Sequence, residues 1–224
     1  MRTVWICPSR NRPANIARLL NAWDDTRAQA DLVVAVDDDD EHLNDYRELF
    51  TDVDPSQFIL SVGPRTKLGP TLNRLAVEYA PHYDAVGFLG DDHIPRTPRW
   101  DQHLADALDG GLAYGNDLFQ GERLATAVLQ SSRIIATLGQ FHPPQLVHLY
   151  LDDYWVALGQ GIGRLTYLPD VILEHVHFTN GKSASDQTYA EANSSENQRN
   201  DQAAWQDYRT TQLPRDIAAL TATA

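Results

Sequence analysis

The stretch GFLGDDH at positions 87–93 decides the fold of this chain, because it is an apolar run that ends in two carboxylates and an imidazole. The run and the four residues before it are short, include aromatic and β-branched residues, and are flanked by turn signals, which predicts a buried strand. Ile94-Pro95 is expected to end the strand. Asp91, Asp92 and His93 then lie at its carboxyl end, the edge of an open α/β sheet at which ligands bind.

Adjacent carboxylates at the end of a buried strand repel each other unless something neutralises them. At an effective dielectric constant of about 20, two charges about 4 Å apart repel by roughly 4 kcal/mol. A shared divalent cation relieves this repulsion, and an oxygen-rich site with some imidazole suits Mg²⁺ or Mn²⁺. Asp91, Asp92 and His93 are therefore candidate metal ligands. An acidic loop with one capping aspartate would give the same local pattern.

The composition indicates one globular α/β domain: 224 residues, 42% hydrophobic and 9% aromatic, are enough to bury a sizeable core. The chain holds 18 Lys and Arg against 31 Asp and Glu, a formal charge of -13, which argues against bulk nucleic-acid binding because that needs a basic face. The single cysteine, Cys7, excludes an intramolecular disulfide and a cysteine zinc cluster. There is no signal-peptide core and no apolar stretch long enough to span a bilayer, so we expect a soluble, cytoplasmic protein.

Three earlier apolar runs also predict strands, and each precedes a pattern with helical period. The strands are expected at 3–7, 32–36 and 58–62, and the helices at 13–23, 42–50 and 71–80. This alternation predicts a Rossmann-like α/β fold with a mainly parallel central sheet and helices on both faces. The loops that follow these strands are expected to converge at one edge of the sheet.

Polar residues in these loops are candidates for binding an anionic or nucleotide ligand. The loop at 8–13 joins a strand to a helix, a natural anion site, although a helix cap with two solvated arginines would look the same. Asp37 opens an acidic run that is otherwise expected to be solvated, and it can accept hydrogen bonds from a base or ribose. Gly69 would let the backbone approach a nucleotide closely, and the side-chain amide of Asn73 would recognise that nucleotide. The alternative is that both residues belong to an ordinary loop without a binding role. The candidates are Pro8, Ser9, Arg10, Asn11, Arg12, Asp37, Lys67, Gly69 and Asn73.

A second acidic pair, Asp152-Asp153, is expected at the amino terminus of a helix, where the helix dipole favours a carboxylate. Capping the helix would need only one of the two. The other is a candidate general base that takes a proton from an attacking hydroxyl, with Asp153 preferred over Asp152.

The strand expected at 167–177 ends in His-x-His, which places His175 and His177 on the same face. Either histidine can have a structural role. Because the chain also holds the triplet at 91–93, whose charges have no predicted partner, a metal-binding role for one of the two histidines is favoured. Lys182 follows in a possible closing loop as a phosphate partner. From residue 183 on, the chain is polar. It is expected to form a helix whose few aromatic residues pack it onto the rest of the protein.

Taken in order, these motifs resemble the nucleotide-sugar glycosyltransferases of the GT-A fold, specifically their family 2-like members. The resemblance runs from the amino terminus to about Lys182. It implies one GT-A-like domain at 1–182, with a nucleotide-sugar-binding half at 1–93 and an acceptor and catalytic half at 94–182. A polar carboxyl-terminal helix and tail at 183–224 would pack on this domain.

On the donor side, the loop at 8–13 looks like the family's first nucleotide loop, and Asp37 matches the acid that meets the uracil or ribose. The segment at 67–69, with Asn73, resembles the next donor-binding segment. Together with Asp91 and Lys182, these residues would bind the nucleoside diphosphate sugar. The resemblance implies that the donor is a UDP-sugar before any other.

On the catalytic side, the triplet at 91–93 occupies the place of the family's Asp-x-Asp metal motif, with His93 where the family has Asp. Asp152-Asp153 stands where the family has the acidic pair that holds the catalytic base. His175 or His177 resembles a metal-ligating histidine that some members have late in the chain.

The resemblance implies a metal-dependent enzyme that moves a sugar from a nucleoside diphosphate sugar to a hydroxyl acceptor, with inversion at the anomeric carbon. Mn²⁺ or Mg²⁺ would neutralise the departing diphosphate. A nucleotidyltransferase shares the sheet and the carboxylate pair but usually has a glycine-rich phosphate loop, which positions 8–13 lack. A nucleotide- or carbohydrate-binding module without catalysis is the remaining alternative.

Overall fold

Eight strands form one sheet in the structure, a computed structural model that describes residues 1–222. The strands are β1 (Thr3–Ser9), β2 (Asp31–Asp37), β3 (Phe58–Gly63), β4 (Ala85–Phe88), β5 (His93–Pro95), β6 (Leu112–Asn116), β7 (Val128–Ser131) and β8 (Leu165–His175). Their order across the sheet is β3-β2-β1-β4-β7-β6-β8-β5. The strands expected in the first half of the chain are therefore all present.

The sheet is mixed, so the prediction of a mainly parallel sheet is wrong, although β6 and β8 of the second half also pair in parallel. β1 to β4 are mutually parallel, whereas β7 runs antiparallel to both β4 and β6, and β5 runs antiparallel to β8. Parallel neighbours need a long crossover, usually through an α-helix, and residues 117–127 connect β6 to β7 with only a short 3-10 helix at Gly121–Arg123. The Ile94-Pro95 pair does not end the sheet pairing as expected, because both residues lie in β5 opposite β8.

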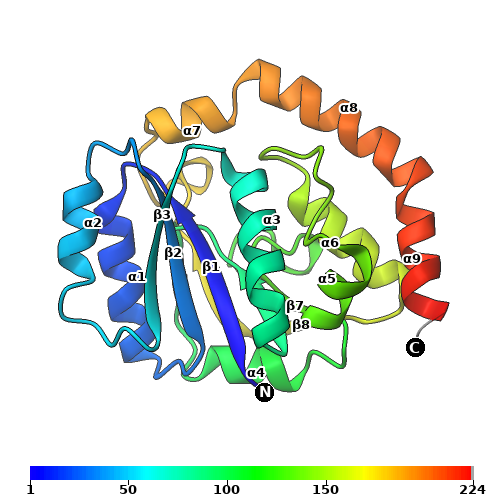
Figure 1. Cartoon of the computed structure of the whole chain (residues 1–224), viewed down its shortest axis with the longest axis horizontal. Coiled ribbons are helices and arrows are strands. Elements are labelled where there is room, and N and C mark those ends of the chain that lie inside the picture. Colours follow the sequence, from blue (N-terminus) through cyan, green and yellow to red (C-terminus); the bar gives the residue numbers. More distant parts are fainter. Residues whose placement is uncertain (223–224) are drawn as a thin grey trace.

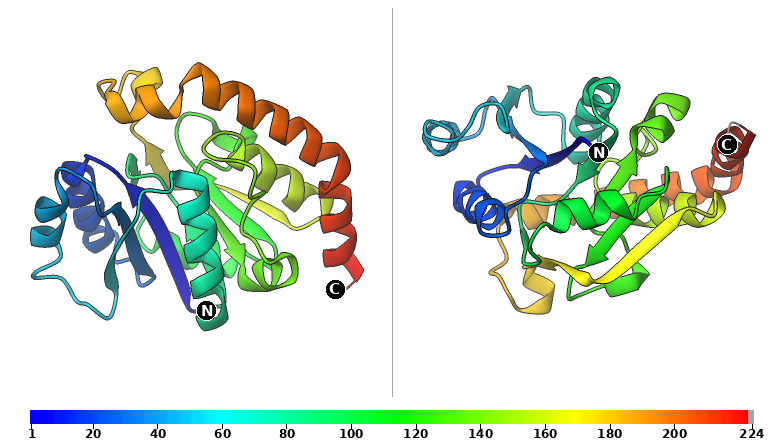
Figure 2. Two further views of the ribbon diagram at one scale, coloured as in Figure 1. Left: turned by 45° about the horizontal axis from the view of Figure 1, so that its top comes forward. Right: turned by 90° about the horizontal axis from the view of Figure 1, so that it is seen from below.

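Helices cover both faces of the sheet (Figure 2). They are α1 (Pro13–Asp25), α2 (Leu43–Leu49), α3 (Leu68–Tyr79), α4 (Trp100–Asp106), α5 (Ser132–Leu138), α6 (Leu151–Gly161), α7 (Gln187–Ala192), α8 (Ser195–Thr211) and α9 (Leu213–Ala222). α1, α2 and α4 share one hydrophobic core, and α3, α5, α6, α8 and α9 share the other. The predicted covering of both faces is confirmed.

Gly87, the first residue of the GFLGDDH stretch, packs directly against the indole ring of Trp5. Trp5 of β1 packs edge-on against Trp100 at 4.7 Å, and Trp100 packs in the same way against Trp23 at 5.1 Å. A Cβ on Gly87 would lie only 2.4 Å from the Trp5 ring. β4 can therefore lie beside β1 because it carries no side chain at this position.

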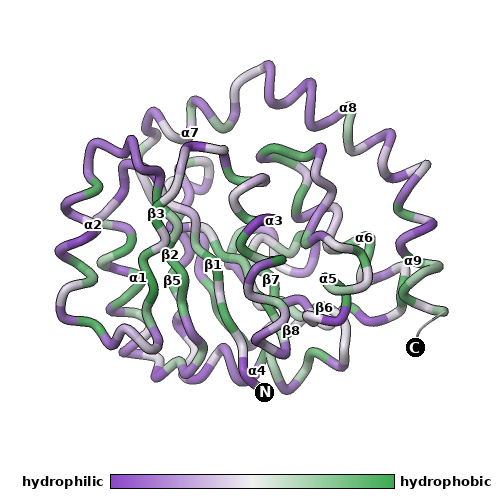
Figure 3. The backbone as a smooth tube through the Cα atoms, viewed as in Figure 1, coloured by the Kyte–Doolittle hydropathy of each residue, from purple (hydrophilic) through white to green (hydrophobic). Residues whose placement is uncertain are grey.

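The carboxyl-terminal helices α7, α8 and α9 form an arch that passes over the carboxyl end of β1 and reaches α6 (Figure 1). α8 is mostly hydrophilic (Figure 3), and its buried Trp205 and Tyr208 pack against Tyr154 of α6. The segment from residue 183 on forms three helices where the sequence predicted one. Within residues 1–222 no helix combines the length and the apolar character needed to cross a membrane.

Replacing Gly87 with alanine is expected to lower the free energy of unfolding by about 1–3 kcal/mol, because the new Cβ overlaps the Trp5 ring that Trp100 holds in place. Urea unfolding followed by tryptophan fluorescence measures the loss. Gly63→Ala is the matched control, since a Cβ there meets only the end of the Arg74 side chain at 3.8 Å. Equal stability of the two variants would contradict this account of the core.

Candidate active site

A cavity of about 770 Å³ lies where the loops after β1, β2, β3 and β4 meet. Segments around residues 119–126, 148–155 and 175–179 complete its walls, and α7 and α8 cover it. The predicted site residues that line it are Pro8, Ser9, Arg10, Arg12, Asp37, Lys67, Asp91, Asp92, His93, Asp152, His175 and His177. Loops that are far apart in the sequence thus converge at one edge of the sheet.

Asp91 is buried and is held by the first loop of the chain. The Ser9 hydroxyl donates a hydrogen bond of 2.7 Å to one carboxylate oxygen, and the Arg12 guanidinium donates one of 3.0 Å to the other. Burial raises the pKa of Asp91, and the positive charge of Arg12 opposes that rise. Both oxygens of Asp91 are therefore used to anchor β1 and the loop that follows it.

Asp92, also buried, has different partners. Its Oδ2 accepts hydrogen bonds from the Tyr189 hydroxyl at 2.7 Å and from His175 Nε2 at 3.3 Å. Burial opposes the charge of Asp92, but the contacts with His175 and His93 outweigh it and hold the pKa of Asp92 well below its usual value. Asp92 is therefore an ionised carboxylate in the cavity wall.

His93 and His175 face each other across the β5–β8 pair, and their rings stack 4.2 Å apart. The N–H of Gly90 donates to His93 Nδ1 at 3.2 Å, and burial lowers the pKa of His93. His175 lies between Asp92 and Asp117, whose carboxylates outweigh the effect of burial and raise the pKa of His175 to about 9. The two stacked rings therefore differ in charge: His93 is neutral and His175 is cationic.

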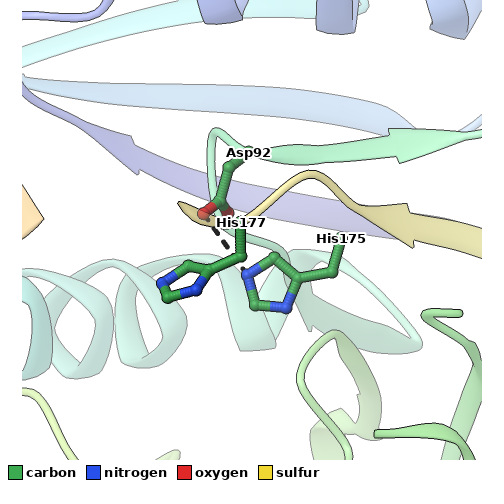
Figure 4. Close-up of side chains that lie close together, drawn as sticks. All are labelled: Asp92, His175 and His177. Atoms are coloured by element: carbon green, nitrogen blue, oxygen red, sulfur yellow. Dashed lines mark hydrogen bonds and ion pairs between the residues drawn. The ribbon is translucent and has the colours of Figure 1, made fainter. Parts of the chain in front are cut away.

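Asp92, His175 and His177 each present one ligand atom to the same space, and the three atoms lie within 4.8 Å of one another (Figure 4). His177 comes two residues after His175, and its Nδ1 lies 2.7 Å from the Thr179 hydroxyl, which orients the ring. One carboxylate and two imidazoles suit Mn²⁺ better than Mg²⁺, which prefers oxygen ligands. The donor atoms of Asp91 and His93, the other predicted ligands, are outside this group.

Four cationic side chains line the part of the cavity formed by the loops after β1 and β3. They are Arg10, Arg12, Arg65 and Lys67. Arg12 makes a bidentate contact with Asp186 at 2.7 Å, and its guanidinium carbon lies 3.9 Å from the centre of the Tyr189 ring. Arg10 pairs with Asp37 at 2.8 Å. Arg65 pairs with Glu191 at 2.6 Å, so an anion that binds here would share these guanidinium donors with the carboxylates that already hold them.

The second acidic pair lies in the first turn of α6, and neither aspartate caps the helix. Asp152 lines the cavity, and Asp153 is not among the described residues that do. Burial and the neighbouring charge of Asp153 raise the pKa of Asp152 to about 6. Of the two aspartates, the lining of the cavity thus includes Asp152 and not Asp153, which the sequence preferred as the base.

Four predicted donor-binding residues are outside the cavity lining: Asn11, Gly69, Asn73 and Lys182. Gly69 packs against the backbone at 146–147, where a Cβ would lie 2.2 Å from a carbonyl oxygen. The Asn73 amide bonds the backbone at 141–142, and Lys182 forms an ion pair of 2.7 Å with a carboxylate of β8. The backbone N–H of Asn11 donates to Asp40. These residues are thus used in packing and in loop structure.

The carboxyl-terminal segment supplies site residues that sequence reasoning missed. Asp186 caps α7 by accepting the N–H of Tyr189 at 2.9 Å, and both residues also contact Arg12. His148 and Arg65 line the cavity as well. The only sequence signal is an aspartate three positions before a tyrosine at a helix start, which is common at ordinary helix caps.

No protein-family model matches the sequence, and no curated protein matches it. Solved structures do match. The mannosyltransferase PcManGT from Pyrobaculum calidifontis, in complex with GDP-Man and Mn2+, is 16% identical, with 99% of this chain and 79% of that chain covered and a TM-score of 0.59. S. aureus TarS 1-349, in complex with UDP, is 14% identical, with a TM-score of 0.57. The match to TarS covers 77% of this chain and 59% of that one, so this chain spans less than two thirds of the TarS fragment.

A third match is a protein from Bacillus anthracis assigned as a glucose-1-phosphate thymidylyltransferase. It is 11% identical, with 84% of this chain and 99% of that chain covered and a TM-score of 0.54. At these identities the likeness concerns the fold alone, and it is consistent with the parallel first half of the sheet and the cavity at its carboxyl edge. This chain has the GT-A fold of nucleotide-diphospho-sugar transferases.

Proposed function

We propose that this protein is a metal-dependent glycosyltransferase that moves a sugar from a nucleoside diphosphate sugar to a hydroxyl acceptor. The observation that carries the proposal is one cavity that combines a basic wall, the Asp92–His175–His177 cluster and the Asp152 carboxylate. These groups match the needs of the reaction: a site for the diphosphate, a site for a cation and a base. The GT-A neighbours in complex with UDP and with GDP-Man and Mn2+ support a nucleotide-sugar donor, and we propose a UDP-sugar first.

The donor would bind along the loops after β1, β2 and β3. Asp37, at the end of β2, is the proposed partner of the ribose or base, and Arg10 holds its carboxylate at 2.8 Å. Arg12, Arg65 and Lys67 are the proposed partners of the diphosphate, since they present charged donors in the same wall. Pro8 and Ser9 shape the floor beneath them.

Asp92, His175 and His177 would hold the metal ion, and we propose Mn²⁺ because two of the three ligands are imidazoles. Such an ion supplies Lewis-acid stabilisation of the charge on the departing diphosphate. Asp117 Oδ2 lies 3.8 Å from His175 Nδ1, so it favours the tautomer that leaves Nε2 available as a ligand. The ring of His177 is oriented by Thr179, whose backbone N–H donates to His177 Nδ1 at 3.3 Å and whose hydroxyl lies 2.7 Å from the same nitrogen.

Asp152 is the proposed general base. Its carboxylate would take the proton of the acceptor hydroxyl while the oxygen attacks the anomeric carbon, and the bond to the diphosphate breaks in the same displacement. A single displacement inverts the anomeric configuration. The raised pKa of Asp152, about 6, makes it a stronger base than a solvent-exposed aspartate while leaving it ionised at pH 7.

The first test is incubation with UDP-, GDP- and dTDP-sugars, each with Mn²⁺ or EDTA, and measurement of the nucleoside diphosphate released. We expect release from one donor that depends on Mn²⁺. The fold is shared with a protein assigned as a nucleotidyltransferase, so the assay with nucleoside triphosphate and sugar phosphate is run beside it. Pyrophosphate release in that assay, with none from the nucleotide sugars, would establish nucleotidyl transfer instead.

His175→Ala is expected to weaken Mn²⁺ binding by at least about tenfold, because it removes one of three ligands from the cluster. Electron paramagnetic resonance of free Mn²⁺ during a titration measures the affinity without any substrate. His103→Ala is the matched control, since His103 is an exposed histidine of α4 that does not line this cavity. Equal affinity in the two variants would remove His175 from the site.

Asp152→Asn is expected to lower the rate of transfer about 10²–10⁴-fold and to leave the affinity for the nucleoside diphosphate unchanged, since the amide cannot accept the proton. Asp153→Asn is the matched control on the neighbouring position of α6, and it should retain the rate. Initial rates and calorimetric binding measure the two quantities. Loss of transfer in Asp153→Asn alone would return the role of base to Asp153.

The pH dependence follows from the same assignment. Below a pKa of about 6 Asp152 is protonated and accepts no proton, so the transfer rate should rise about tenfold per pH unit up to about pH 6 and then level off. A pH–rate profile at saturating donor measures this rise in the rate below pH 6. The rise should be missing from the residual activity of Asp152→Asn.

A further inference from the structure

Residues 183–198, called here the α7 segment, form part of the cavity wall and include three acidic residues but no lysine or arginine. Two of the three carboxylates are paired with arginines that line the cavity. Asp186 makes a bidentate contact with Arg12 at 2.7 Å, and Glu191 pairs with Arg65 at 2.6 Å. The chain itself therefore supplies carboxylates to the guanidinium groups that are the proposed partners of the diphosphate.

All three nitrogens of Arg12 already donate to carboxylates. Nε and Nη2 donate to the two oxygens of Asp186, and Nη1 donates to Asp91 at 3.0 Å. The carbon of the same guanidinium lies 3.9 Å from the centre of the Tyr189 ring. A phosphate group binds arginine through the same two parallel N–H donors that a carboxylate uses. A phosphate on this edge of Arg12 would therefore take the place of Asp186.

The α7 segment has one buried side chain, that of Tyr189, whose hydroxyl donates to Asp92 at 2.7 Å. Its other contacts are polar, as in the hydrogen bond of 3.3 Å from the Thr188 hydroxyl to the carbonyl oxygen of Arg10. The next buried residue along the chain is Asp201 of α8. Exposed ion pairs add little to stability, and segments with few buried contacts open most readily. The α7 segment can thus leave the wall while the core stays folded.

We propose that the α7 segment is an autoinhibitory latch: Asp186 and Glu191 occupy the guanidinium groups of Arg12 and Arg65, and a diphosphate displaces them when it binds. This inference rests on the proposed function, because the diphosphate is that of the nucleotide sugar. A diphosphate concentrates several negative charges in one group, so it competes for these arginines more strongly than a single carboxylate does. Opening the latch uses part of the binding energy, which lowers the apparent affinity for the donor.

The first test compares affinities with and without the two carboxylates. The variant Asp186→Asn/Glu191→Gln keeps the size of both side chains, and asparagine still caps α7 by accepting the N–H of Tyr189. Calorimetry on the full chain measures the binding of UDP and GDP with Mn²⁺, and of inorganic pyrophosphate without metal. We expect at least one nucleotide, and pyrophosphate, to bind at least fivefold more tightly to the variant than to the unaltered protein.

Asp207→Asn/Glu48→Gln is the matched control, because it makes the same two charge changes at exposed positions of α8 and α2 that do not line the cavity. Its affinities should stay close to those of the unaltered protein, and thermal unfolding checks that both variants are folded. Equal affinities in the two double variants, or no binding of any probe to Asp186→Asn/Glu191→Gln, would overturn the latch.

Hydrogen–deuterium exchange follows the α7 segment directly. In the unaltered protein, the amides of residues 183–198 should exchange at least fivefold faster with UDP, GDP or pyrophosphate bound than without a ligand. Slower exchange would indicate a lid that closes on its ligand and would overturn the latch, while nucleotide binding would leave the proposed function in place. Tighter pyrophosphate binding by Asp186→Asn/Glu191→Gln, with no nucleotide bound by any form, would overturn the proposed function and keep the latch.

Discussion

Two carboxylates, Asp91 and Asp92, are adjacent in the sequence and both buried, and the architecture of the site depends on neutralising each of them separately. At an effective dielectric constant of about 20, their mutual repulsion would reach roughly 4 kcal/mol at about 4 Å. Asp91 is bonded to Arg12 from the loop after the first strand, and Asp92 to His175 of the last strand and Tyr189 of α7. One pair of charges therefore holds together segments from the beginning, the middle and the end of the chain.

The acidity of the chain also has a structural use, because buried aspartates hold loops by their backbone N–H groups. Asp201 of α8 accepts the N–H groups of residues 147–149 at 2.8 to 3.0 Å, as Asp117 does for residues 119–121. Each held segment adjoins a left-handed residue, Tyr150 or Leu118. Hydrogen bonds to charged acceptors contribute about 1.5–3 kcal/mol each, enough to maintain such strain. Both loops line the same cavity, so these hydrogen bonds help to hold its walls.

The sequence was sufficient for features that depend on local pattern. The four parallel strands, their helices and the position of Asp91 and Asp92 at a sheet edge follow from apolar runs and turn signals. The sequence was insufficient where pairing between distant segments determines whether a strand forms. β5 is three residues long and is a strand only because β8 pairs with it. The turn of α6 brings Asp152 and not Asp153 into the cavity lining, and Gly69 packs closely against the backbone at 146–147. Such contacts join residues too distant in sequence for a periodicity to reveal.

Asp117 connects the histidine cluster to the loop that carries Phe119. A cation bound by Asp92 Oδ2 and His175 Nε2 would replace the hydrogen bond that these two atoms make with each other at 3.3 Å. His175 must then lose a proton, and Asp117, 3.8 Å from Nδ1, favours retaining the remaining proton on that nitrogen. The same carboxylate holds the backbone of Phe119. Asp117 is therefore the one carboxylate that both lies beside the ring of His175 and holds the backbone of the neighbouring wall among the residues described here.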